Sequence, residues 1–134
     1  MTIYVYDSGA LIAGEKGSTP LLTLHRRSLE RGQPPQVPGP VISQVWRGKA
    51  RNARMARILS ECETVLGFTE DDYKDAGRML GDAALSKRKR PDVVDALVAL
   101  TAKNSQAGGV VTSDDRDITA YLDAIGYECE VLHV

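Results

Sequence analysis

The sequence predicts an α/β fold in which a mainly parallel sheet is covered by helices on both faces, and three observations lead to this prediction. Short runs rich in β-branched and aromatic residues alternate with longer segments that carry helix start and stop signals. No repeat, low-complexity tract or linker interrupts the alternation. A chain of 134 residues is long enough for one hydrophobic core. We therefore expect a single domain over residues 1–134.

Composition excludes several classes of protein. Apolar residues make up 43% of the chain and charged residues 26%, as in ordinary globular proteins, which argues against disorder. No stretch approaches the ~18 apolar residues of a membrane span, and the N-terminus has no basic stretch followed by a long apolar run. Cys62 and Cys129 match no metal or redox spacing. We expect a cytoplasmic protein without a membrane segment, whose two cysteines are core residues.

The first elements are a short strand and two helices. The run TIYVY is rich in strand formers and ends at Asp7, and SGALIAGEKG predicts a Ser-capped turn into a short helix. The segment STPLLTLHRRSLERG predicts a second helix, with Ser18 or Thr19 near its N-cap. Pro20 suits the first turn of that helix, and Gly32 suits the position after its end.

The rest of the chain continues the alternation of strands and helices. Prolines limit PPQVPGPV to a short strand or extended segment. The charged joint KRKR at 87–90 precedes the apolar helix PDVVDALVALTA, in which Pro91 suits the first turn. The other expected elements are, in order, a short helix in VISQVWRG, a basic amphipathic helix in NARMARILSECE, a strand in TVLGF, a Thr-capped helix over roughly 70–85, a strand in GGVVTSDDRD, a helix in ITAYLDAIG and a strand in YECEVLHV.

Two aspartates stand out in the apolar helix. Asp92 and Asp95 are three positions apart, so their carboxylates share one helix face. Asp95 lies beyond the first residues of the expected helix and is followed by ALVAL, a run that we expect to be buried. Carboxylates beside a buried run need a neighbour that offsets their charge.

Further aspartates follow two of the predicted strands. Asp7 ends the first strand, and an acidic stretch follows the fourth. In open parallel sheets, ligands bind beyond the carboxyl ends of the strands. Carboxylates brought together there would repel one another, and a divalent cation removes that repulsion. Clustered aspartates without nearby His or Cys favour Mg2+ or Mn2+ over zinc. The acids of this expected site are Asp7, Asp92, Asp95, Asp114 and Asp117.

Each of these acids also has a structural explanation when taken singly. Asp7 suits the N-cap of the helix after it, and Asp114 or Asp117 suits the N-cap of the helix that begins near 117. Asp92 is favoured at a helix start by the helix dipole alone. Asp95 is the acid that such roles explain least well, and the coincidence of several acids at strand ends favours a site.

Three motifs resemble those of a known family. The segments VYDSGALIA, DVVDALVALTA and VVTSDDRD, in this order and spacing, resemble a PIN-domain ribonuclease of the VapC toxin type over nearly the whole chain. The resemblance implies a three-layer α/β/α sandwich with a central, mainly parallel five-stranded sheet. It also implies a Mg2+- or Mn2+-dependent endoribonuclease that hydrolyses RNA phosphodiester bonds, forms a homodimer and is neutralised by a cognate antitoxin protein.

The resemblance also assigns roles to the aspartates. By position, Asp7, Asp95 and Asp114 match the catalytic acids of the family, and all three are expected to hold the metal. Asp92 and Asp117 resemble additional metal-binding acids of a subgroup with DVVDA and SDxxD patterns.

One position departs from the family pattern. The second acid of the family is usually a Glu in the helix after the second strand, where this chain has Gln44 in VISQVWRG. Glutamine offers a neutral carbonyl oxygen that adds no charge to hold a metal. We hypothesise that Asp92 compensates for the missing charge. The alternative is a catalytically weakened PIN module that binds RNA or a protein partner without efficient cleavage.

Polar and basic side chains complete the expected site. Thr112 and Ser113 lie next to Asp114, where a hydroxyl either supports the metal site or caps the next helix. Residues 1–57 hold nine Lys or Arg and three Asp or Glu, a balance of +6, whereas residues 58–134 hold eight and fifteen, a balance of −7. Basic side chains are therefore candidates for RNA phosphate contacts, first among them Arg47, Lys49 and Arg51, with HRR, Arg31 and KRKR as further stretches.

A phosphoryl-transfer receiver domain is a third possibility, since it also clusters acids at strand ends. The strand TVLGF is not followed by a phosphoacceptor Asp, and the last strand is not preceded by the Lys that such domains use. The sequence therefore disfavours a receiver domain.

Overall fold

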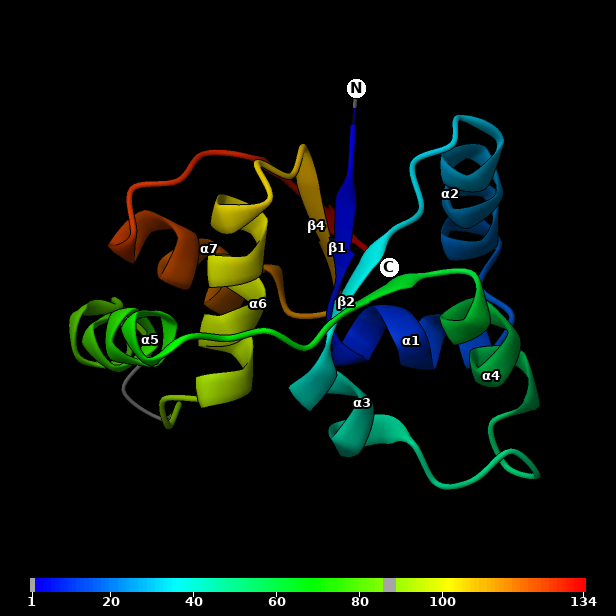
Figure 1. Ribbon diagram of the computed structural model, residues 1–134, viewed down its shortest axis with the longest axis horizontal. Coiled ribbons are helices and arrows are strands. Elements are labelled where there is room, and N and C mark those ends of the chain that lie inside the picture. Colours follow the sequence, from blue (N-terminus) through cyan, green and yellow to red (C-terminus); the bar gives the residue numbers. More distant parts are fainter. Residues whose placement is uncertain (1, 86–88) are drawn as a thin grey trace.

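The structure, a computed structural model, describes residues 2–85 and 89–134 and confirms the predicted α/β fold. Within these residues, five strands form one all-parallel sheet in the order β3-β2-β1-β4-β5. Helices flank both faces of this sheet, which gives three layers (Figure 1). The strands are β1 (Tyr4–Tyr6), β2 (Gln36–Pro38), β3 (Glu63–Val65), β4 (Gly109–Thr112) and β5 (Glu130–His133).

The helices divide between the two faces of the sheet. In Figure 1, α1, α2 and α4 lie on one side of the strands, and α5, α6 and α7 lie on the other. α3 follows β2 directly and packs against α1 and α6. The helices are α1 (Ser8–Glu15), α2 (Thr19–Glu30), α3 (Gly39–Val45), α4 (Ala53–Ser60), α5 (Glu70–Asp82), α6 (Val93–Asn104) and α7 (Asp115–Ala124).

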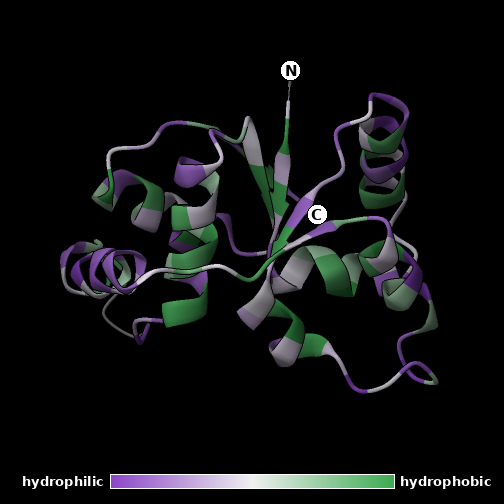
Figure 2. Ribbon diagram, viewed as in Figure 1, coloured by the Kyte–Doolittle hydropathy of each residue, from purple (hydrophilic) through white to green (hydrophobic). Residues whose placement is uncertain are grey.

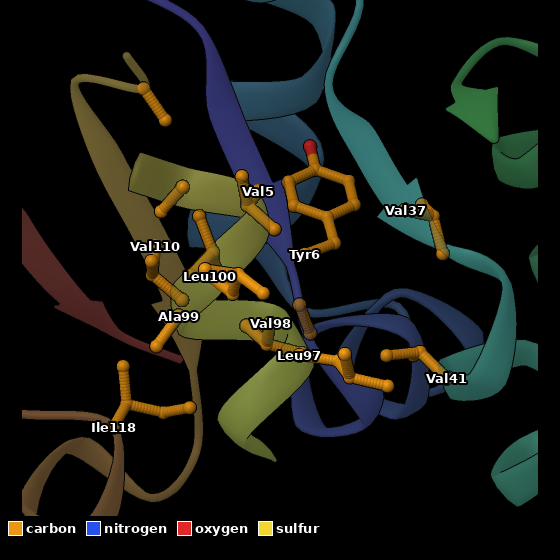
Figure 3. Packing of buried hydrophobic residues seen from close by; sticks show 14 of the residues in the cluster. Val5, Tyr6, Val37, Val41, Leu97, Val98, Ala99, Leu100, Val110 and Ile118 are labelled. Atoms are coloured by element: carbon orange, nitrogen blue, oxygen red, sulfur yellow. The ribbon is translucent and has the colours of Figure 1, made fainter. Parts of the chain in front are cut away.

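The core is built around the apolar helix α6. Its residues from 96 to 102 are all buried, as expected for the run ALVAL, and α6 is green along most of its length in Figure 2. Figure 3 shows Leu100 on the side of the sheet where Val5 and Val110, which are paired in register, present their side chains. Burying a leucine of this kind contributes roughly 1.5–3 kcal/mol.

Neighbouring side chains of β1 point to opposite faces of the sheet, because side chains alternate along a strand. Val5 faces α6, whereas Tyr6 reaches α2 on the other face, where its hydroxyl lies 3.0 Å from His25 Nδ1. The second ring nitrogen of His25 lies 3.3 Å from Glu61 Oε1, just before β3. The buried Tyr6 hydroxyl is thereby satisfied, and α2 is tied to the sheet.

Most helix starts follow the signals in the sequence. Ser18 caps α2, and Thr69 caps α5 in a capping box with Asp72. α5 ends at Asp82, slightly earlier than the expected end near 85. Gly126, with φ of +65°, allows the chain to turn after α7.

Two helix starts differ from the sequence prediction. α1 is capped by Asp7 rather than by Ser8, because the Asp7 carboxylate accepts a hydrogen bond from the Ala10 N–H at 2.9 Å. α6 begins at Val93 with Asp92 as its N-cap, so Pro91 precedes the helix instead of lying in its first turn. Asp92 is therefore outside the helix, and Asp95 lies in the first turn rather than beyond it.

The parallel sheet brings several chain segments to one edge. β1 ends just before Asp7 and β4 ends at Thr112, while α3 and α6 begin at the same end of the molecule (Figure 1). Cys62 and Cys129 are free thiols that are partly buried against the core. Among residues 2–85 and 89–134, no helix is long and apolar enough to cross a membrane.

Candidate functional site

Asp7 occupies the carboxyl end of the central strand. Its side chain is buried, with 4% of its surface exposed, and its backbone N–H donates to the carbonyl of Val111 at 3.2 Å. Burial raises the pKa of Asp7, and hydrogen bonds from the Thr112 side chain and the Ala10 N–H act in the opposite direction. The capping bond fixes one carboxylate oxygen toward α1.

Asp114 follows the neighbouring strand β4, two residues after its end at Thr112. It caps α7, and its Oδ1 accepts a hydrogen bond from the Asp117 N–H at 3.4 Å. The fully buried Thr112 hydroxyl accepts a hydrogen bond from the Asp114 N–H at 2.8 Å. Thr112 thus fixes the turn that leads into α7, while the N-cap of that helix is Asp114. Ser113 between them is exposed.

A close approach of two backbones joins these strand ends. A Cβ added to Gly9, in the first turn of α1, would lie 2.7 Å from the backbone nitrogen of Ser113. Real Cβ atoms essentially never come this close to another atom, so a larger residue at this position would force the two backbones apart. The absence of a side chain lets the start of α1 pack against the loop after β4, and this contact brings Asp7 toward Asp114.

Asp92 and Asp95 enter the site from the start of α6. The Asp92 Oδ1 accepts hydrogen bonds from the Val94 N–H at 2.8 Å and the Asp95 N–H at 3.2 Å. Three of the five predicted acids are therefore N-caps, and the positive ends of α1, α6 and α7 point at this edge of the sheet.

The pKa of Asp95 is affected by the charges of the other four acids. Burial raises the pKa of Asp95 to about 7, and the negative charges of the other four acids add to the effect. Such repulsion requires the carboxylates to lie within electrostatic reach of one another. The structure thus places Asp95 within electrostatic reach of the other four acids that the sequence singled out, namely Asp7, Asp92, Asp114 and Asp117.

A lysine lies among the acids. The Lys89 Nζ is 2.7 Å from Asp114 Oδ2 and 3.1 Å from Asp117 Oδ2. This hydrogen bond lowers the pKa of Asp114, and the two carboxylates raise the pKa of Lys89. The sequence placed Lys89 in a stretch proposed to meet RNA phosphates. Lys87 and Arg88 of that stretch lie outside the described residues.

Tyr121 is a site residue that the sequence analysis missed. Its hydroxyl, in α7, accepts a hydrogen bond from the backbone N–H of Asp92 at 2.9 Å. Burial raises the pKa of Tyr121, and the charges of Asp95 and Asp92 contribute in the same direction. One signal was present in the sequence, because Tyr121 lies four residues after Asp117 and thus on the same face of α7.

The remaining predicted residues lie around α3. Gln44 is half-buried in this helix. Arg47 donates from its guanidinium to the carbonyls of Trp46 at 2.8 Å and Gln44 at 3.1 Å. Lys49 and Arg51 are exposed on the same loop between α3 and α4. Figure 1 places this loop at the end of the molecule where the strands terminate.

The donor set fits a hard divalent cation. The acids offer carboxylate oxygens, which Mg2+ and Mn2+ prefer, and one cation, the Lys89 ammonium, is already held between two of them. Among residues 2–85 and 89–134, no group of three or more His, Cys, Asp or Glu side chains is arranged to hold an ion. Three of the carboxylates are instead turned toward helix N–H groups.

A hollow of the described surface lies away from the five acids. It has a volume of about 490 Å³ between the end of α5 and α7 and is lined by Asp82, Arg116 and Asp123, among others. None of the five acids lines it. In comparisons with known proteins, neither a protein-family model nor a curated protein matches the chain.

Proposed function

We propose that the chain is a Mg2+- or Mn2+-dependent endoribonuclease that acts as the toxin of a toxin–antitoxin pair. The observation that carries the proposal is the place of Asp95 in the first turn of α6, where it is partly buried and four further carboxylates at this edge of the sheet repel its charge and raise its pKa. A divalent cation would relieve this repulsion. The resemblance of the three acidic motifs to PIN-domain ribonucleases supports RNA as the substrate.

The five acids have two different proposed roles in holding such an ion. Asp7, Asp95 and Asp114 are the proposed catalytic ligands, and Asp92 and Asp117 support them. When bound, the ion would lower the pKa of a water and offset charge on the phosphate oxygens. The capping bonds of α1, α6 and α7 orient the carboxylates. The Tyr121 hydroxyl fixes the backbone of Asp92, and Thr112 fixes that of Asp114.

The partners follow from the same resemblance. We propose a cytoplasmic homodimer that is neutralised by a cognate antitoxin protein. Arg47, Lys49 and Arg51 are the proposed contacts to RNA phosphates, supported by their place on one loop beside α3. The positive balance of residues 1–57 supports an RNA path over this half of the chain.

A cleavage assay tests the proposal. Structured RNAs incubated with the purified chain are expected to be cut in the presence of Mn2+ and to stay intact in EDTA. Asp7→Ala and Asp95→Ala are expected to lower the cleavage rate by at least about 100-fold, because each removes a ligand. Asp123→Ala, an exposed acid of α7 outside the cluster, serves as the control. Absent or metal-independent cleavage would contradict the proposal.

A second function is favoured by Gln44, the neutral residue in α3 where the family carries an acid. In this case the chain would bind RNA or a protein partner without efficient cleavage. Retention of RNA on a filter in Mn2+ without cleavage, together with cleavage by Gln44→Glu, would identify this case. Asp92→Asn keeps the capping oxygen but removes the charge. Unchanged Mn2+ affinity and cleavage in this variant would refute the idea that Asp92 compensates for Gln44.

A further inference from the structure

The position of Lys89 has a consequence for metal binding. Asp114 has two carboxylate oxygens, and both are engaged. Its Oδ1 accepts a hydrogen bond from the backbone N–H of Asp117, and this bond caps α7. Its Oδ2 lies 2.7 Å from the Lys89 Nζ. Asp117 offers its Oδ2 to the same ammonium at 3.1 Å. One carboxylate oxygen of each acid, Oδ2 in both, therefore already contacts the Lys89 ammonium.

We propose that Lys89 is an internal counter-ion of the acidic site, which a divalent cation must displace in order to bind Asp114 and Asp117. This inference rests on the proposed metal-dependent function. An ammonium is a compact point charge with three donors and no acceptor, so it cannot share an oxygen closely with another cation. Mg2+ approaches its ligands to about 2.0–2.1 Å, closer than the ammonium, and the two positive charges would repel each other strongly at that range.

Lys89 is suited to leave the site. Its side chain is 49% exposed, and it comes from the segment before α6, whereas its partners belong to the start of α7. Asp117 is more enclosed, with 13% of its side chain exposed. The other ion pairs of the described residues, such as those between Arg78 and Asp75 or between His133 and Asp115, include none of the five acids. Among the described pairs, the contact of Lys89 is thus specific to the site.

Competition of this kind sets the affinity for the metal. With Lys89 in place, a divalent cation must first break the two contacts of the ammonium, and this cost makes the net free energy of metal binding less favourable. Removing the ammonium leaves the carboxylates uncompensated and therefore open to the cation. The metal affinity is expected to rise when Lys89 loses its charge.

Titration of the metal-free full chain with Mn2+ in a calorimeter tests this inference without relying on activity. Lys89→Met keeps an unbranched apolar stem and removes the charge, and it is expected to bind Mn2+ about 3- to 10-fold more tightly than the wild type. Lys103→Met makes the same change of net charge at the exposed far end of α6 and is expected to stay within about 2-fold of the wild type. Lys89→Gln provides an independent replacement, and circular dichroism verifies that each variant folds.

The possible outcomes distinguish the counter-ion role of Lys89 from the metal site itself. If the wild type binds Mn2+ and both Lys89 variants bind it equally or more weakly, the counter-ion role is wrong while the metal site stands. If neither the wild type nor the variants bind Mn2+, both the counter-ion role and the metal-dependent function are wrong. Binding by the Lys89 variants alone, or tighter binding by them than by Lys103→Met, supports the inference.

Discussion

Asp95 is the acid of the site whose pKa responds to all four of the others. It lies in the first turn of α6, directly before the fully buried part of that helix. Its pKa rises to about 7 because the carboxyl is partly buried and faces the charges of Asp92, Asp7 and two acids of the α7 start. Without a cation, the charged form of Asp95 is therefore unfavourable in the folded protein.

This environment predicts how stability depends on pH. The carboxyl of an aspartate in an unfolded chain loses its proton at about pH 4, whereas Asp95 in the folded protein keeps its proton to about pH 7. Between these values the folded state binds more protons than the unfolded state, so the free energy of unfolding falls as pH rises. The raised pKa of Asp7 acts in the same direction. The metal-free protein is thus expected to be more stable at about pH 5 than at about pH 8.

Asp95→Asn checks the cause of this dependence. At about pH 8 in EDTA, the substitution is expected to raise the free energy of unfolding by about 1–2 kcal/mol, less than the full shift of pKa implies because Asp95 is partly exposed. At about pH 5 the gain should largely vanish, because the carboxyl is then mostly neutral. Urea unfolding at both pH values measures the effect. An equal change at both would show that charge is not the cause.

At the scale of elements, the site depends on three helix starts that meet at one sheet edge. The capping acids of α1, α6 and α7 each satisfy backbone N–H groups and also contribute charge to the cluster. The start of α1 reaches this position because Gly9 leaves room for the backbone of Ser113. A local change of packing is therefore expected to disturb the cluster.

Gly9→Ala tests the close approach of these elements. The added methyl group is expected to lower the free energy of unfolding by about 1–3 kcal/mol, because the crowded atoms include backbone that cannot move aside freely. Mn2+ affinity should fall as well, since Asp7 moves relative to Asp114. Gly77→Ala in α5 is the matched control, because a Cβ there meets nothing within 4 Å. The control is expected to raise stability by about 0.5–1 kcal/mol, and equal effects of the two substitutions would contradict this account.

At the scale of the whole molecule, the arrangement of the chain was largely predictable and the contacts within the site were not. Alternating strand and helix signals predicted the parallel sheet, and the run after Asp95 predicted the burial of α6. The capping role of Asp92 could not be predicted, because whether α6 starts at residue 91 or 93 depends on a local balance of hydrogen bonds. The partners of Lys89 and Tyr121 depend on distances between elements that are remote in sequence.

The uneven distribution of charge along the chain is also a property of the whole molecule. Residues 1–57 carry a balance of +6, and three of their basic side chains lie on the loop between α3 and α4. Replacing Arg47, Lys49 and Arg51 together with alanine is expected to weaken RNA binding. The slope of log affinity against log salt concentration should become shallower by about 2, as expected for the loss of three phosphate contacts to single-stranded RNA.

The control for this experiment carries the same charge change on the opposite half of the chain. Lys74, Arg78 and Lys103 are exposed on α5 and α6, and their joint replacement with alanine should leave the slope nearly unchanged. Fluorescence anisotropy of a labelled RNA in EDTA, which prevents metal-dependent cleavage, measures both slopes. If both triple variants reduced the slope equally, RNA binding would depend on the net charge of the chain and not on the loop between α3 and α4.

The measurement that tests the central claim most directly is the rate of RNA cleavage as a function of Mn2+ concentration for the wild type and Asp95→Asn. The acidic cluster predicts that the wild-type rate rises from zero in EDTA to a plateau, as a binding site fills. Asp95→Asn, which removes one charge from the centre of the cluster, is expected to stay near zero across the same range. Cleavage that persists in EDTA, or that is equal in the two proteins, would contradict the assignment of the cluster as a metal-dependent nuclease site.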